Sequence, residues 1–251
     1  MIKKHQIGII GYGNFSKVLI EHLYPYADIV VHDRRHELGR IDGVQFVSVE
    51  RALSRAIVIP SIPSQFFESF FADHQTLINP QALIVDVCSV KVNPLQTLER
   101  LLPATCEIIG AHPMFGPASI ARNGGIEGLP IALCPVRADD VRVAKLRDFL
   151  ADALQLKVIE TTPEQHDKEM AYVQGLSHYI GRVMDIMRIP QSELRTAAYE
   201  DLLDMKRIQG GDSWELFMSI MHENPYAQEV HQEFERAQRD LDRQLGLLAP
   251  L

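Results

Sequence analysis

A histidine and a serine each follow an apolar run, in positions that suit proton transfer. His112 precedes Pro113, and a residue before proline is held in extended geometry, so the imidazole is presented at the end of a predicted strand. Imidazole has a reference pKa of about 6.5 and accepts a proton at neutral pH. Ser89 follows a neighbouring apolar run, and its hydroxyl could orient the same substrate oxygen. We predict His112 as a catalytic base and Ser89 as its partner.

These residue types also have other common roles in proteins. A lone histidine is more often a surface or core residue, although its position before a proline at a strand end makes that less expected here. A serine hydrolase is disfavoured because the chain contains no Gly-x-Ser-x-Gly sequence. Lys91 either assists the site or is a phosphate-side or solvated lysine.

A glycine-containing turn near the start of the chain predicts a dinucleotide site. The pattern Gly-x-Gly-x-x-Ser lies between an apolar run and a helical stretch, where glycines allow a tight turn and the helix N-terminus can hold a pyrophosphate. By itself this motif could be an incidental turn, but it opens an alternating strand–helix pattern. The candidate cofactor contacts in the turn are Gly11, Gly13, Asn14, Phe15 and Ser16.

The residues after the second predicted strand bear on the choice of cofactor. Asp33 lies 20 residues after Gly13, where an acid accepts hydrogen bonds from ribose hydroxyls and disfavours a 2′-phosphate. Arg34 and Arg35 follow directly, and a guanidinium suits a 2′-phosphate. We expect NAD or NADP, with NAD favoured, while the arginines could also form a solvated turn.

The elements that must position these residues fall into two groups. Apolar strands alternating with helices predict an α/β fold with a doubly wound parallel sheet in residues 1–161, followed by an all-helical domain in residues 162–251. The strands are predicted at 6–10, 27–32, 56–59, 83–87, 106–110, 131–134 and 157–160, with a first helix at 17–23. The later helices are predicted at 163–187, 191–205, 214–223 and 225–247. The last has an apolar stripe that packs on its own domain or against a second subunit.

Composition limits the class of protein. The net charge of −8 argues against nucleic acid or an anionic membrane as a partner. The three scattered cysteines fit neither a disulfide framework nor a zinc site, so we expect no metal. No signal peptide or membrane span is evident, which predicts a cytoplasmic protein with a small-molecule substrate.

Longer motifs resemble the arogenate/prephenate dehydrogenase family of tyrosine biosynthesis, nearest to the plant-type arogenate dehydrogenases. The similar segments are 11–15, 86–91, 110–117, 174–183, 199–203 and 211–213, so the resemblance spans nearly the whole chain. It implies a Rossmann-type domain, a helical dimerisation domain forming a homodimer, and NAD(P)-dependent oxidative decarboxylation.

The resemblance also implies substrate contacts in the second half of the chain. Gln174 and His178 share a helix face and would line the substrate site, although a packed polar pair is the alternative. Thr196 resembles a pocket threonine, and Arg207 a substrate-carboxylate ligand that plant relatives lack. Asp212 would pair with the ammonium group of arogenate and disfavour prephenate, unless it caps the following helix.

Two other functions remain open from sequence. A β-hydroxyacid dehydrogenase shares the two-domain plan but usually carries a lysine on the first long helix of its helical domain, where this chain has Gln174 and His178. A non-catalytic sensor of NAD is the second alternative, and it predicts that replacement of His112 leaves function intact.

Overall fold

The computed structural model describes residues 5–36, 38–41, 43–210 and 212–247. The chain divides into two compact units, residues 1–164 (unit 1) and residues 165–251 (unit 2). The roles predicted for the two halves, cofactor binding and dimerisation, stay predictions.

Unit 1 is built on one nine-stranded sheet in the order β3-β4-β2-β1-β5-β6-β7-β8-β9. The strand order reverses at β1, which pairs in parallel with β2 on one side and β5 on the other. A reversal of this kind opens a crevice at the carboxyl ends of the strands. The strands are β1 (His5–Ile10), β2 (Ala27–His32), β3 (Gly39–Ile41), β4 (Val44–Phe46), β5 (Ile57–Pro60), β6 (Leu83–Asp86), β7 (Glu107–Pro113), β8 (Pro130–Arg137) and β9 (Lys157–Glu160).

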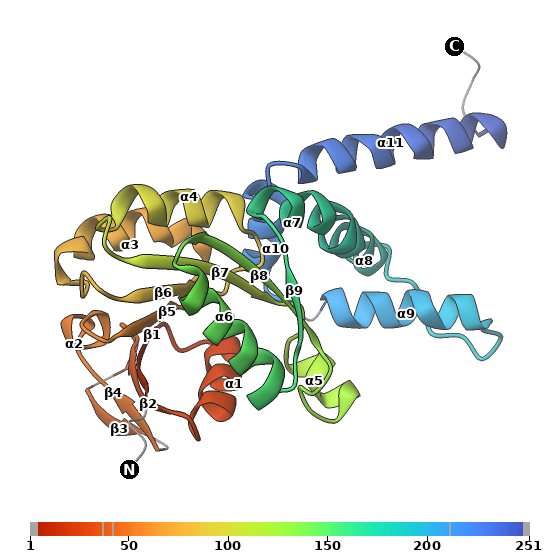
Figure 1. The fold of residues 1–251 in the computed structure, drawn as a ribbon. Coiled ribbons are helices and arrows are strands. Elements are labelled where there is room, and N and C mark those ends of the chain that lie inside the picture. The colour runs from red at the N-terminus through yellow and green to blue at the C-terminus, as the bar shows by residue number, and fades with distance from the viewer. Residues whose placement is uncertain (1–4, 37, 42, 211, 248–251) are drawn as a thin grey trace. The chain divides into compact units, whose positions relative to one another are not determined.

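Helices cover both faces of this sheet, which confirms the predicted fold class (Figure 1). Alternate strand residues enter different cores: Ile84 packs with the helices of one face, whereas Leu83 and Val85 pack with those of the other. The first face carries α2 (Val49–Leu53), α3 (Phe67–His74) and α4 (Val92–Leu101). The second carries α1 (Asn14–Leu23), α5 (Pro117–Asn123) and α6 (Asp140–Asp148).

Two features of the sheet differ from the prediction. The short hairpin β3–β4 was not predicted, because three-residue strands carry no readable periodicity. Strand β8 is antiparallel to β7, so the expectation of a wholly parallel sheet is wrong. The seven residues of α5 span about 10 Å, whereas the seven of β7 span about 23 Å, so this helix is too short to carry the chain back.

Unit 2 is helical throughout its described residues, apart from the connections between helices. The predicted helix at 163–187 is three segments: α7 (Pro163–Met170), a π-helical turn (Ala171–Leu176) and α8 (Ser177–Ile186). It is followed by α9 (Ala197–Gly210), α10 (Trp214–His222) and α11 (Ala227–Gln244). Among the described residues, no helix is long and apolar enough to cross a membrane.

Candidate active site

The turn after β1 has the close backbone packing that the glycine pattern predicts. Gly11 has φ +99°, a conformation that favours glycine, and a Cβ there would lie 2.6 Å from the carbonyl oxygen of Ser61. Gly13 has open space around it, since a Cβ at this position would meet nothing within 4 Å, so a ligand could approach its backbone. Ser16 is fully buried and its hydroxyl donates to Ser61 Oγ at 2.9 Å, which ties α1 to the end of β5.

Asn14 and Phe15 form the first residues of α1, whose ten residues begin directly after Gly13. The N–H groups at a helix N-terminus attract anionic groups such as a pyrophosphate. The turn therefore fits a dinucleotide, through its exposed glycine backbone, its helix N-terminus and the acid at the end of the next strand.

That acid, Asp33, is held by a dense set of donors. Its Oδ2 accepts from the Tyr12 N–H at 2.8 Å and from Arg35 Nη2 at 3.0 Å. Its Oδ1 accepts from the Arg35 N–H and Nε, and lies 3.3 Å from His36 Nδ1. Burial acts to raise the pKa of Asp33, but these hydrogen bonds, led by that of Arg35, outweigh it and hold the pKa well below its usual value.

Arg35, and not Arg34, therefore makes the contact with the acid. Arg34 is exposed at the surface directly after Asp33. The Arg35 side chain is 65% exposed, so a bound ligand could reach it and compete for it. A ribose hydroxyl could bind Asp33 only by displacing part of this fork, whereas a 2′-phosphate would meet two guanidinium groups.

Ser89 and His112 lie near the carboxyl ends of adjacent parallel strands. Asp86 at the end of β6 pairs with Gly110 of β7. Ser89 follows Asp86 by three residues and His112 follows Gly110 by two, so the topology brings both to the same edge of the sheet. His112 is the penultimate residue of β7 and is 4% exposed, while Ser89 is half-buried in the loop after β6.

A buried ion pair joins these two strand ends. Lys91 and Asp86 have fully buried side chains, and Lys91 Nζ donates to Asp86 Oδ2. The same ammonium donates to the carbonyl oxygen of Ala111 at 2.7 Å, directly before His112. A Cβ at Gly110 would lie 3.1 Å from Lys91 Cδ, so glycine there makes room for the lysine stem. Lys91 is therefore not a solvated lysine.

In unit 2, Gln174 and His178 lie in the segment from the π-helical turn into α8. His178 is buried, and its Nε2 is 3.6 Å from Asp212 Oδ2. Burial and the positive charge of Arg182 lower the pKa of His178 to about 4, which keeps the imidazole neutral at physiological pH. Burial raises the pKa of Asp212, and Arg182 opposes that rise.

The other two predicted substrate contacts lie elsewhere in unit 2. Thr196 is exposed, and its hydroxyl oxygen accepts from the Tyr199 N–H at 3.3 Å at the start of α9. Arg207 is also exposed and pairs with Asp204 at 3.1 Å on the same helix. The partners of Thr196 and Arg207 therefore lie on α9 itself and not in the group around His178 and Asp212. The helix cap after Asp212 is Ser213, whose hydroxyl oxygen accepts from the Leu216 N–H, so capping does not account for Asp212.

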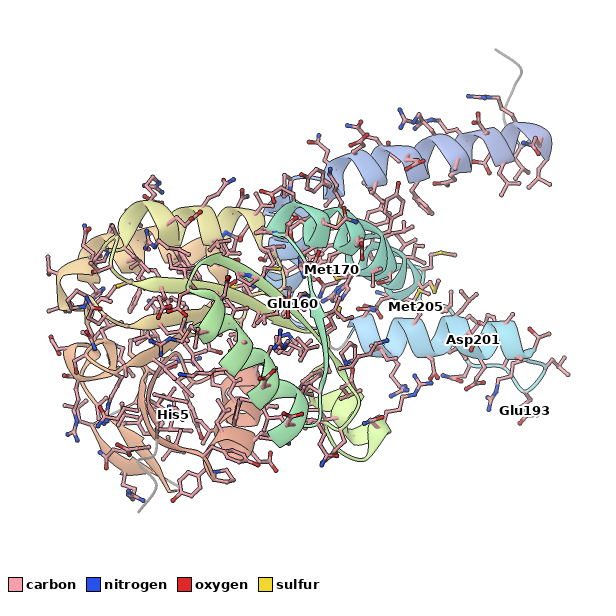
Figure 2. The ribbon with its side chains drawn as sticks, viewed as in Figure 1. His5, Glu160, Met170, Glu193, Asp201 and Met205 are labelled. Carbon is pink, nitrogen blue, oxygen red and sulfur yellow. The ribbon has the colours of Figure 1, made fainter. Side chains whose placement is uncertain are left out.

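Sequence reasoning assigned no role to Arg182 or Gln209. Arg182 follows His178 by four residues, a helical spacing that could have indicated it. Gln209 comes from α9 and approaches Gly181, where a Cβ would lie 2.6 Å from the Gln209 Cβ. Met205, labelled in Figure 2, borders the same close contact. No local sequence signal predicts this approach.

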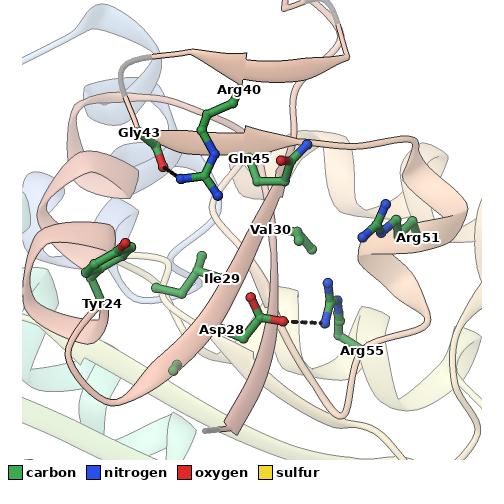
Figure 3. A pocket seen from close by; sticks show the side chains of 10 residues that line it. Tyr24, Asp28, Ile29, Val30, Arg40, Gly43, Gln45, Arg51 and Arg55 are labelled. Carbon is green, nitrogen blue, oxygen red and sulfur yellow. Dashed lines mark hydrogen bonds and ion pairs between the residues drawn. The ribbon is translucent and has the colours of Figure 1, made fainter.

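A hollow of about 280 Å³ lies away from all of these residues (Figure 3). It is formed around the first residues of β2 and includes Arg40, Arg51 and Arg55, of which Arg55 pairs with Asp28 at 3.0 Å. None of its lining residues belongs to the predicted sites, because Asp33 and the glycine turn are at the opposite ends of β1 and β2.

Comparison with known proteins identifies relatives of both halves. Residues 28–159 match the family model for the prephenate dehydrogenase nucleotide-binding domain, and residues 183–247 match the TYRAAT1-like C-terminal domain. Arogenate dehydrogenases 1 and 2 of Arabidopsis thaliana, both named as chloroplastic, are each 29% identical over 96% of the chain. The chain spans 39% of the first relative's length and 70% of the second's.

Solved structures share the fold. Prephenate dehydrogenase from A. aeolicus, in complex with hydroxyphenyl propionate and NAD⁺, has a TM-score of 0.72 at 19% identity, covering 97% of this chain and 91% of that one. Synechocystis arogenate dehydrogenase has a TM-score of 0.67 at 20% identity, covering 96% and 91%. Because the family model covers more than half of the sequence, the chain belongs to the prephenate dehydrogenase family, as the motifs around Ser89 and His112 predict.

Proposed function

We propose that this protein catalyses NAD(P)-dependent oxidative decarboxylation of arogenate or prephenate, with arogenate preferred. The observation that carries the proposal is the placement of Ser89 and His112 near the ends of neighbouring strands, joined by Lys91, in a chain of this family. The A. thaliana relatives are named arogenate dehydrogenases, which supports the same reaction.

The substrate is a cyclohexadienol with a carboxylate on its ring. When bound, the oxidised nicotinamide supplies the acceptor for the hydride that leaves the carbinol carbon. His112 takes the hydroxyl proton, and Ser89 orients the same oxygen. The electron pair of the bond to the departing carbon dioxide enters the ring, which becomes aromatic. Aromatisation drives this loss, so the chemistry requires no metal ion.

Asp212 is the basis for the arogenate preference. Arogenate carries an ammonium group where prephenate carries a keto group, and a partly buried carboxylate pairs with an ammonium. The side chain of Asp212 is 39% exposed and lies beside His178. A pairing of this kind is worth about tenfold to a hundredfold in selectivity. Asp212→Asn should reduce the preference for arogenate by this factor.

For the cofactor, the protein should accept both dinucleotides. Arg35 neutralises Asp33, which weakens the repulsion of a 2′-phosphate, while Arg34 is exposed beside it. The sequence-based preference for NAD depends on Asp33 exchanging its bonds with Arg35 for bonds to a ribose. The preference for NAD stays a prediction, which a comparison of rates with NAD and with NADP tests.

A homodimer through unit 2 completes the proposal. Several large apolar side chains of this unit are exposed, including Ile186 at 80%, Leu194 at 95% and Leu245 at 63%. Such residues suit a subunit interface, and sedimentation equilibrium would show a monomer if the proposal is wrong.

A cytoplasmic location also stays a prediction, since the A. thaliana relatives are named as chloroplastic.

The decisive experiment measures initial rates of reduced-nicotinamide formation with arogenate and with prephenate, each with NAD and with NADP. His112→Asn should lower kcat by about 10²- to 10⁴-fold, while His74→Asn on α3 serves as the matched histidine control. Turnover unaffected by the loss of His112 would refute its role as the catalytic base. Inactivity of the wild type with both substrates would refute the proposed reaction and favour either a β-hydroxyacid substrate or the non-catalytic sensor.

A further inference from the structure

Unit 2 contains a group of buried polar atoms without hydrogen-bond partners among the described residues. These atoms are Gln174 Oε1, His178 Nδ1, Arg182 Nε and Gln209 Oε1. Buried polar atoms are nearly always hydrogen-bonded, because leaving one unpaired costs about 1–3 kcal/mol. All four atoms left unpaired in this way belong to one helical unit, which points to a ligand that is bound there.

The helices account for this grouping. His178 and Arg182 are four residues apart on α8, so they share a face. Gln174 lies one step earlier, within the π-helical turn, a feature often found at functional sites. Gln209 is brought close from α9 because position 181 has no side chain to hold the two helices apart.

Arg182 is held in a fixed position with part of its guanidinium uncommitted. Its Nη2 donates to the carbonyl oxygen of Asp212, and its Cζ lies 5.8 Å from the Trp214 ring centre and 5.6 Å from that of Phe217. Aromatic rings on a guanidinium fix its plane without using its N–H groups. A preformed planar donor of this kind suits a carboxylate.

The neighbouring groups have the opposite polarity. The side-chain oxygens of Gln174 and Gln209 are hydrogen-bond acceptors without a donor among the described residues, and Asp212 is a carboxylate close to His178. A donor cation beside several acceptors, one of them charged, is complementary to a ligand that carries both a carboxylate and an ammonium.

We propose that Arg182 binds the side-chain carboxylate of the substrate, so that Arg182 and Asp212 together recognise an α-amino acid group. The inference rests on the proposed function for the identity of that substrate. It gives the carboxylate to Arg182 rather than to Arg207, whose side chain is 66% exposed and paired with Asp204. The carboxylate is common to arogenate and prephenate, so Arg182 serves both, whereas Asp212 distinguishes them.

Three phenols, the product L-tyrosine and two analogues that each lack one of its charged groups, test the two contacts separately. L-Tyrosine carries the carboxylate and the ammonium, 3-(4-hydroxyphenyl)propionate carries only the carboxylate, and tyramine carries only the ammonium. Calorimetric titration of each into the full chain gives affinities that do not depend on turnover. The variants are Arg182→Gln, Asp212→Asn and, as an exposed arginine on α11, Arg239→Gln.

We expect Arg182→Gln to weaken tyrosine and hydroxyphenylpropionate by about 10- to 100-fold and to leave tyramine unchanged. Asp212→Asn should weaken tyrosine and tyramine and leave hydroxyphenylpropionate unchanged, while Arg239→Gln changes none of them. Equal weakening of all three probes by Arg182→Gln, or no weakening, overturns the proposal. The same applies if Arg207→Gln reproduces the carboxylate-selective loss, or if none of the probes binds the wild type.

Two further measurements distinguish a failure of this inference from a folding defect in the variant and from a failure of the proposed reaction. Circular dichroism checks each variant, and if Arg182→Gln does not fold, Arg182→Lys replaces it. The lysine keeps the charge without the planar fork, so it should weaken the binding of the two carboxylate probes several-fold and leave the binding of tyramine unchanged. If the chain oxidises neither arogenate nor prephenate but the probe pattern holds, the reaction is wrong and the amino-acid site remains. If the chain oxidises arogenate or prephenate but the probe pattern is absent, the proposed reaction holds and the amino-acid site is refuted.

Discussion

Replacing Lys91 with methionine would remove one charge from the buried pair that joins β6 to β7. Methionine is similar in length to lysine but lacks the ammonium group, so the change removes charge and hydrogen bonds with little loss of volume. Two acceptors lose their donor: the carboxylate of Asp86 and the carbonyl oxygen of Ala111. Both Asp86 and Lys91 are inaccessible to solvent, so water cannot replace the ammonium.

The expected cost follows from that burial. Removing one partner of a buried ion pair costs about 3–5 kcal/mol, because the remaining charge is uncompensated. Asp86 keeps a bond from the Cys88 N–H at 3.0 Å, which places the expected loss near the lower end, at about 3 kcal/mol. Since Ala111 precedes His112, the variant should also displace the base, and kcat should fall about 10- to 100-fold.

Urea unfolding monitored by circular dichroism measures the loss, with Lys157→Met as an exposed-lysine control on β9. The double variant Asp86→Asn/Lys91→Met removes the stranded charge and should recover at least half of the lost stability. A single variant within about 0.5 kcal/mol of wild type, the range of ordinary surface substitutions, would refute the reasoning. So would losses that simply add in the double variant.

Three further outcomes are expected. Gly8→Ala would place a Cβ 2.0 Å from a backbone carbonyl oxygen, so urea unfolding should show a loss of about 3 kcal/mol or more, whereas Gly116→Ala, with open space around it, should not. The pKa of His178 is about 4 in the folded chain and about 6.5 in the unfolded chain. As the pH is lowered from about 6.5 to about 4, the unfolded chain takes up a proton first, so the free energy of unfolding decreases by up to about 3 kcal/mol. His178→Gln should abolish this part of the pH dependence, and an unchanged slope contradicts it. Arg35→Ala frees Asp33 for a ribose and should shift the kcat/KM ratio toward NAD by about tenfold; an unchanged ratio in paired NAD and NADP assays is the contrary result.

Much of the architecture could be predicted from local patterns. The central strands are buried on both faces, so they appear in the sequence as apolar runs, and β2 and β9 were predicted with the bounds observed. The turn at Gly11 was readable because its backbone conformation favours glycine. The motifs at Ser89 and His112 could be predicted because Ser89 lies in the loop shortly after a strand and His112 lies near the end of one, which places both at the same edge of the sheet.

What local patterns could not give is the partner of each group. Arg34 and Arg35 are adjacent and identical in type, and only the folded turn shows which of them binds Asp33. Lys91 looked equally suited to solvent until its burial between β6 and β7 was seen. The direction of β8 depends on the short reach of α5, a length relation that no periodicity expresses.

Local sequence patterns were enough to predict the family, the central parallel strands, the glycine turn and the pair of residues suited to proton transfer, because these depend on burial patterns and on neighbours along the chain. The packing of the helices decides that Asp212 approaches His178 and that Gln209 of α9 packs against Gly181 of α8. Those contacts join segments far apart in the chain, and their energies depend on desolvation and on the charges that surround each group. Such a site exists only once the helices have packed.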